Sequence, residues 1–164
     1  MKNSKTEKAY FAAGCFWGAA HYLQKLKGVI FTQVGYSGGE EENPSYEDVC
    51  NRNTGHKETV MVVFDPDVLS YKELVRYFFS IHDFTQTNGQ GPDIGDQYVS
   101  VIFFVDDEQK ALSEAVIEDL QSMGYEVATG LSQFEHFWVA EDYHQNYYAK
   151  NGKEPYCHVY KKIW

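Results

Sequence analysis

The sequence contains few of the features that define several large protein classes. Its 164 residues include only three cysteines, an odd number that does not suit a framework of structural disulfides. No pair of cysteines has the C-x-x-C spacing, and the six histidines show no paired ligand spacing, so we expect no zinc site and no cofactor. No apolar run reaches the roughly 18 residues that a membrane-spanning helix needs.

Positive charge is also scarce. Lys and Arg number 14 against 24 Asp and Glu, which gives a formal net charge of −10. This acidity argues against binding to nucleic acid or to an anionic membrane, and we interpret it as a contribution to solubility. The first eight residues lack the apolar segment of a secretory signal, so we expect a cytoplasmic protein.

The length and composition fit a single domain over residues 1–164 with a substantial core. Hydrophobic residues make up 43% of the chain, and no repeat, low-complexity segment or linker divides it. We expect residues 1–7 to form a loose leader and residues 151–164 an irregular tail. Aromatic residues reach 16%, enough to line a recognition cleft as well as to fill the core.

Hydrophobic periodicity predicts alternating strands and helices. Strands are expected over 8–13, 29–36, 57–65 and 98–105, with one or two short ones within 125–139; helices over 16–27, 71–82, 107–123 and 141–150, with a helical turn over 46–50. Ser70 and Glu73 have the spacing of a capping box. The order strand–helix–strand–strand–helix–strand predicts an α/β (α+β) fold of the ferredoxin-like, split βαβ type, with helices on one face of the sheet, long loops and an irregular C-terminal tail.

The run Gly14-Cys15-Phe16-Trp17-Gly18 lies where a predicted strand gives way to a predicted helix. A helix N-terminus offers unpaired N–H groups and partial positive charge, which favour a thiolate at Cys15. Gly14 permits a sharp turn and Gly18 permits close approach of another group. Neighbouring helical residues point in different directions, so at least one of the two aromatic side chains is expected to face a cleft. A buried, inert cysteine is the alternative.

This run resembles the signature of the peptide methionine sulfoxide reductases of type A. The resemblance continues in order through Gly35-Tyr36-Ser37-Gly38-Gly39, Asn43-Pro44-Ser45-Tyr46, Val49-Cys50, Thr54-Gly55-His56-Lys57-Glu58, Phe64-Asp65-Pro66, His82-Asp83, Gln97-Tyr98 and Ala140-Glu141-Asp142-Tyr143-His144-Gln145. The matches extend from about Cys15 to Cys157. The resemblance implies an α/β plait with extensions, and an enzyme that reduces methionine S-sulfoxide, free or in peptides and proteins.

Reduction of a sulfoxide requires a soft nucleophile and a proton for the departing oxygen. Cys15 is the expected nucleophile. Glu58 opens a strongly apolar predicted strand, where partial burial would raise the pKa of its carboxyl. From the surrounding residues alone, a solvated charge at a strand start is the favoured interpretation of Glu58. The resemblance favours the first reading, because the catalytic acid of the family falls on this position.

The resemblance assigns further roles around these two groups. It implies that the hydroxyls of Tyr46 and Tyr98 bind the sulfoxide oxygen, and that Asp93 orients the substrate through water. Phe16 and Trp17 would hold the sulfoxide methyl group, which can make only apolar contacts. Three more residues are expected to support the site: Tyr36, Asp142 and His144.

Attack by Cys15 would release methionine and leave a sulfenic acid, which a second thiol then converts to a disulfide. Cys157 is the expected resolving cysteine, because an irregular tail can reach a distant site. Cys50 is the competing candidate. A dithiol reductant of the thioredoxin kind would restore the enzyme. We expect the protein to be a monomer.

Two other functions fit parts of the sequence. A cysteine hydrolase or acyltransferase would pair Cys15 with a histidine. A non-catalytic peptide-binding module would use the aromatic residues and would not need Cys15. Loss of one oxygen from a peptide sulfoxide in the presence of dithiothreitol, followed by mass, separates the three functions.

Overall fold

The computed structural model describes residues 5–39, 44–51, 55–145, 147, 150 and 158–164, without the side chains of residues 50, 51 and 96. Its strands are β1 Glu7–Ala12, β2 Val29–Ser37, β3 Lys57–Phe64, β4 Gly89–Gln90, β5 Asp93–Ile94, β6 Val101–Phe104, β7 Gly130–Gln133 and β8 Trp138–Val139. The helices are α1 Phe16–Leu23, α2 Tyr46–Asn51, α3 Tyr71–Ser80 and α4 Asp107–Ser122, with 3₁₀ turns η1 Asp96–Tyr98 and η2 Asp142–His144.

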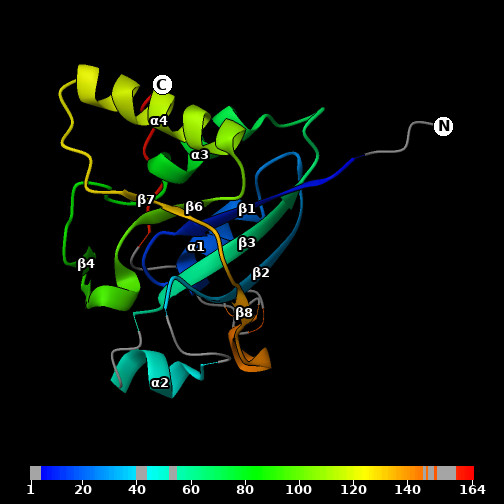
Figure 1. Ribbon diagram of the computed structural model, residues 1–164, viewed down its shortest axis with the longest axis vertical. Helices are drawn as coiled ribbons and strands as arrows, with labels where there is room; N and C mark the ends of the chain where they lie inside the picture. The colour runs from blue at the N-terminus through cyan, green and yellow to red at the C-terminus, as the bar shows by residue number, and fades with distance from the viewer. Residues whose placement is uncertain (1–4, 40–43, 52–54, 146, 148–149, 151–157) are drawn as a thin grey trace.

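A six-stranded sheet in the order β7-β6-β1-β3-β2-β8 forms the centre of the molecule (Figure 1). All neighbouring strands run antiparallel except β6 and β7, which are parallel. The inner strands β6-β1-β3-β2, with α1 and α3 as the connecting helices, form the ferredoxin-like arrangement that the element order predicts. That prediction is confirmed, and β7 and β8 extend the sheet at its two edges.

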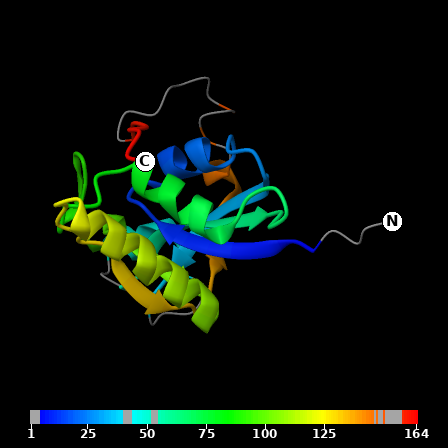
Figure 2. The same cartoon turned by 90° about the horizontal axis from the view of Figure 1, so that it is seen from above.

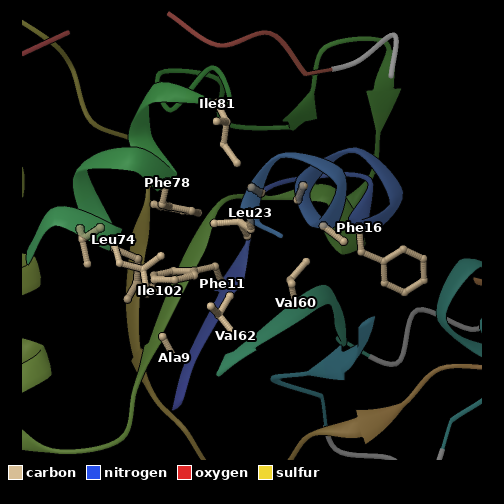
Figure 3. Packing of buried hydrophobic residues seen from close by; sticks show 14 of the residues in the cluster. Ala9, Phe11, Phe16, Leu23, Val60, Val62, Leu74, Phe78, Ile81 and Ile102 are labelled. Carbon is tan, nitrogen blue, oxygen red and sulfur yellow. The ribbon is translucent and has the colours of Figure 1, made fainter. Parts of the chain in front are cut away.

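The alternation of side chains along the strands divides the apolar residues between the two faces of the sheet. Ala9 and Phe11 of β1 join a large buried cluster with residues of α1, α3 and α4, whereas Tyr10 and Ala12 belong to a smaller cluster on the other face. Figure 3 shows side chains of α3 directed toward Phe11 and the neighbouring strands. Figures 1 and 2 show α3 and α4 lying side by side. Together with α1, they cover the face of the sheet on which Ala9 and Phe11 lie.

The helix starts follow from their capping residues. The Ser70 hydroxyl accepts a hydrogen bond from the Glu73 backbone N–H at 3.1 Å, as the capping-box spacing predicts. In the same way, the Asp106 carboxylate accepts from the Gln109 backbone N–H at 2.8 Å and starts α4. Both helices therefore begin where the sequence places them.

Three predicted elements have different limits in the structure. Helix α1 ends at Leu23, before the predicted end at residue 27, in a series of turns that close at Gly28 with φ of 103°. Strand β6 begins at Val101, because residues 96–98 form a 3₁₀ turn instead. The helix predicted from residue 141 begins as η2. The β4–β5 hairpin was not predicted, since two-residue strands carry no periodic signal.

The last residues of the chain pack against α3. The Lys161 backbone N–H donates to the Ser80 carbonyl at 2.7 Å, and the Arg76 guanidinium lies 5.5 Å from the centre of the Trp164 ring. The segment 158–164 contains no helix or strand, as expected for the tail. The end of the chain is therefore tied to the helical layer.

His158 is the one fully buried side chain at the start of this segment, with 1% of its surface exposed beside Val159 at 72%. Its Nε2 donates to the Ala13 carbonyl at 2.5 Å. A Cβ atom on Gly18 would lie 2.2 Å from His158 Nδ1. Gly18 of α1 therefore has no side chain because the His158 ring occupies that space.

We expect Gly18→Ala to destabilise the fold by about 1–3 kcal/mol, the usual cost of overpacking a filled core. The same substitution in a His158→Ala background should instead stabilise α1 by up to about 1 kcal/mol, because alanine is the better helix former. Urea unfolding of the wild type, both single variants and the double variant measures this reversal. Equal costs of Gly18→Ala in both backgrounds would contradict the packing described.

Candidate active site

Cys15 lies at the turn between β1 and α1 and is 6% exposed as a thiol. It is the N-cap residue of α1, and its carbonyl accepts from the Ala19 backbone N–H at 3.2 Å. Gly14 makes the turn with φ of 84°, a left-handed conformation that glycine adopts without strain. The thiol therefore meets the positive end of α1, which favours its ionised form.

Glu58 lies against the same turn. It is the second residue of β3, is 2% exposed, and its Oε1 accepts from the Phe16 backbone N–H at 3.2 Å. The donor is the residue next to Cys15, so this hydrogen bond brings the carboxyl beside the thiol. Glu58 is not a solvated strand-start charge, because its side chain is buried.

Burial raises the pKa of Glu58 well above its usual range, and the neighbouring charge of Cys15 raises the pKa further. The Phe16 N–H lowers this pKa, Asp93 raises it and a hydrogen bond with the Tyr98 side chain lowers it, without reversing the net increase. Glu58 Oε2 is also buried, and among the described residues it has no hydrogen-bond partner. The raised pKa favours the protonated, neutral form of this side chain beside the Cys15 thiol.

Tyr98 and Asp93 lie near Cys15 and Glu58, and both belong to the connection between α3 and β6. Tyr98 ends η1, with its backbone N–H donating to the Gly95 carbonyl at 3.1 Å, and Asp93 is the first residue of β5. Both side chains are half-buried and both act on the carboxyl of Glu58. The unpredicted hairpin and 3₁₀ turn are therefore the elements that bring these residues to the site.

The aromatic side of the site is organised around His144. Trp17 Nε1 donates to His144 Nδ1 at 3.0 Å, and the Trp17 ring stacks on the Tyr147 ring with centroids 3.7 Å apart. Indole is only a donor, so His144 Nδ1 carries no proton and the imidazole is neutral. Burial lowers the pKa of His144, although Glu141 raises it, which agrees with this tautomer. His144 is therefore an acceptor that fixes the Trp17 ring.

The His144 ring also links Phe16 and Tyr46. Its centroid lies 5.1 Å from the Phe16 ring and 4.6 Å from the Tyr46 ring. The structure thus brings together seven of the eight predicted site residues: Cys15, Phe16, Trp17, Tyr46, Glu58, Asp93 and Tyr98. Among the expected supporting residues, Tyr36 and His144 are buried in the same region, whereas Asp142 is exposed.

Both candidates for the resolving thiol fall outside these observations. Cys157 lies outside the described residues, and only the backbone of Cys50 is described, as part of α2. Their roles stay predictions.

Two side chains at the site were not recognised in the sequence. Tyr147 forms the stack on Trp17, and Gln145 Oε1 accepts from the Val34 backbone N–H at 2.9 Å while its Nε2 donates to the Val34 carbonyl at 2.9 Å. Gln145 ends the matched run 140–145, which was the available signal for its importance. Nothing near Tyr147 in the sequence indicates its partner.

A cavity of about 550 Å³ lies away from the candidate site. It lies between the C-terminal end of α3, the loop that follows it and the tail, and its lining includes Phe79, Phe84 and Lys161 but none of the predicted site residues. We identify the site from its chemical groups. In the described part of the chain, no three metal-ligating side chains gather in one place. Nor does any helix there combine the length and apolar character needed to cross a bilayer.

Comparison with known proteins gives concordant results. The family model described as peptide methionine sulfoxide reductase matches residues 7–163. A peptide methionine sulfoxide reductase MsrA of Methanosarcina acetivorans is 52% identical over 149 residues, 89% of this chain and 79% of that protein. One from Thermus thermophilus is 45% identical over 93% of this chain and 88% of that protein. The reduced form of Mxr1 from Saccharomyces cerevisiae superposes with a TM-score of 0.89, at 35% identity, over 98% of this chain and 95% of that one.

Proposed function

The chain belongs to the peptide methionine sulfoxide reductase family, and from this premise we propose that Cys15 and Glu58 together carry out its thiol-dependent reduction of methionine sulfoxide. The enzyme is a peptide-methionine (S)-S-oxide reductase. The other two functions, a cysteine hydrolase and a non-catalytic peptide-binding module, are not favoured by this family membership.

One observation carries the proposal: Glu58 Oε1 accepts from the Phe16 N–H at 3.2 Å, at the helix start that Cys15 caps. A neutral acid and a nucleophilic sulfur are the two groups that the reaction needs. The Cys15 sulfur attacks the sulfoxide sulfur while Glu58 protonates the sulfoxide oxygen. The attack forms a bond between the two sulfur atoms; this bond and the sulfoxide S–O bond then break as the hydroxyl moves to Cys15, which becomes a sulfenic acid. The methionine sulfur is thereby reduced by two electrons, and the cysteine sulfur is oxidised by two.

The remaining site residues have proposed roles in holding the substrate. The phenol groups of Tyr46 and Tyr98 would donate to the sulfoxide oxygen, and Asp93 would orient the substrate through water. Phe16 and the Trp17 ring, which His144 fixes, would enclose the methyl group. Asp93 and Tyr98 both act on the Glu58 carboxyl, and the His144 ring contacts Phe16, Trp17 and Tyr46, which supports the assignment.

We further propose that Cys157 condenses with the Cys15 sulfenic acid to form a disulfide and water, and that a dithiol protein of the thioredoxin kind reduces the disulfide. A solved complex of Mxr1 with Trx2, 25% identical to this chain with a TM-score of 0.65, supports such a partner. A single cytoplasmic domain that acts as a monomer is part of the proposal.

Cys157→Ser tests the whole proposal. Without reductant, the variant should convert about one equivalent of the S-sulfoxide of a methionine peptide to methionine, because the first step needs only Cys15. Thioredoxin-driven turnover should collapse, because the sulfenic acid has no partner. Mass spectrometry of the peptide and titration of remaining thiols measure both quantities, with the R-sulfoxide peptide as the negative control.

Cys50→Ser is the matched control and should turn over normally. If Cys157→Ser turns over and Cys50→Ser does not, the resolving role belongs to Cys50. If the wild type leaves the S-sulfoxide peptide unchanged, the proposed reaction itself is wrong.

A further inference from the structure

The segment 140–145 is attached to β2 at both of its ends. The Ala140 backbone N–H donates to the Val34 carbonyl at 3.0 Å, and the Gln145 side chain pairs with both backbone groups of Val34. Two attachments to one residue of a central sheet leave this segment little freedom. The side chains between them, including Glu141, are therefore presented in fixed positions.

The Glu141 carboxylate gathers four groups from three parts of the chain. The Tyr46 backbone N–H lies 3.2 Å from Oε1 and 3.4 Å from Oε2. The Tyr36 hydroxyl donates to Oε1 at 3.4 Å, and the Tyr143 hydroxyl donates to Oε2 at 3.0 Å. His144 Nε2, which carries the ring proton, lies 3.6 Å from Oε2.

Tyr46 is the first residue of α2, a helix of six residues. So short a helix is not stable alone, and its first N–H groups have no partners within the helix. A carboxylate at this end satisfies one of these groups and interacts favourably with the helix dipole. Ser45 and Asp48 cap the start of α2 locally, and Glu141 ties this capped start, with the backbone of Tyr46, to the segment 140–145.

The same carboxylate relates Tyr46 to the reacting pair. Tyr36, which donates to Glu141, lies directly opposite Glu58 in the register of β2 and β3. Glu141 thus connects Tyr46 to Tyr36 of β2, the residue that lies opposite Glu58.

We propose that Glu141 is a positioning residue, which holds Tyr46 at the distance from Glu58 that the sulfoxide oxygen requires. Glu141 does not touch the substrate and transfers no proton. This inference rests on the proposed role of Tyr46. It assigns to Glu141 a contribution to substrate reduction that acts through Tyr46 alone.

Steady-state kinetics of single and double variants test the inference. Glu141→Ala should lower kcat/KM for a methionine sulfoxide peptide about ten- to a hundredfold, the scale of a misplacement of about 1 Å. Glu141→Gln keeps an acceptor for the Tyr46 N–H and should recover most of this loss. Glu118→Ala, which removes an exposed carboxylate on α4, is the control and should leave kcat/KM unchanged.

The decisive measurement is a double-mutant cycle that combines Glu141→Ala with Tyr46→Phe. Once the hydroxyl is absent, Glu141→Ala should cost less than about twofold, because the group that it positions is gone. If Glu141 only stabilised the fold, its removal would lower the melting temperature and cost the same with tyrosine or phenylalanine at position 46. That result would overturn the inference. Should Glu141→Ala fail to fold, Glu141→Asp, which keeps the charge on a shorter side chain, replaces it.

The single variants separate the two proposals. If Tyr46→Phe is impaired and Glu141→Ala is not, the positioning role is wrong while the proposed function stands. If Tyr46→Phe alone keeps the wild-type kcat/KM, the role of Tyr46 is wrong and the positioning role falls with it.

Discussion

Cys15→Ser is expected to abolish sulfoxide reduction in a protein that remains folded. A serine hydroxyl is a far weaker nucleophile than a thiolate, and it has no route to a sulfenic acid. Loss of a catalytic nucleophile costs on the order of a millionfold in rate. The change in volume is small and the thiol is 6% exposed, so the surrounding packing should survive. Methionine release in a single turnover, read by mass spectrometry, gives the result.

The same preparation should have a wild-type urea midpoint, which separates loss of chemistry from loss of structure. Appreciable methionine release from Cys15→Ser would mean that another group attacks the sulfoxide. It would remove the basis for the whole assignment.

Glu58→Gln is expected to slow the sulfoxide-reduction step about a hundred- to ten-thousandfold, the usual contribution of a general acid. Glutamine keeps the shape and can still accept from the Phe16 N–H, but it has no proton to transfer. Substrate affinity should change little, because Tyr46 and Tyr98 still bind the oxygen. Single-turnover rates over a range of substrate concentrations separate the two effects.

The pH dependence sharpens this expectation. Glu58 has its pKa raised by burial, so the wild type keeps its acid protonated well above the ordinary carboxyl range and slows only as the pH passes that raised value. The rate of Glu58→Gln should not show this fall with rising pH. The difference in rate between the variant and the wild type should shrink at low pH, where solvent supplies the proton. A near-normal rate for the variant would show that a tyrosine or water provides the proton instead.

Stability gives an independent check of the same group. The folded protein keeps the Glu58 proton at pH values where the unfolded chain has lost it, because the folded pKa is raised. The stability that this proton contributes is present below the ordinary carboxyl pKa and is lost as the pH rises toward the raised value. As the pH rises from the ordinary carboxyl pKa to the raised pKa of Glu58, the unfolding free energy of Glu58→Gln should therefore increase relative to that of the wild type.

The sheet was predictable because its signal is local. Val60, Val62 and Phe64 alternate with Met61 and Val63, and the two sets join different clusters on opposite faces of the sheet. The order of elements then leaves few topologies, and the ferredoxin-like one is observed. The position of Cys15 could also be predicted from the sequence, since a glycine-flanked cysteine at a strand-to-helix turn is a local pattern.

The supporting network was only partly predictable, because its contacts are distant in sequence. Trp17 and His144 are 127 positions apart, and Tyr46 and Glu141 are 95 apart. Nothing in the residues around Glu141 indicates that its carboxylate meets a helix start on another segment. Glu58 lies between these cases: its apolar strand indicated burial, but the hydrogen bond from Phe16 that brings it to Cys15 depends on the folded sheet.

The order of the sheet also bears on how the enzyme can be altered. Cys15 follows β1 and Glu58 lies on β3, and these two strands are hydrogen-bonded neighbours at the centre of the sheet. The ladder holds neighbouring strands about 4.8 Å apart. Tyr46 and Tyr98 lie on α2 and η1, outside the sheet. A library that varies the residues flanking these two tyrosines would therefore leave the backbone spacing of the thiol and the acid as it is.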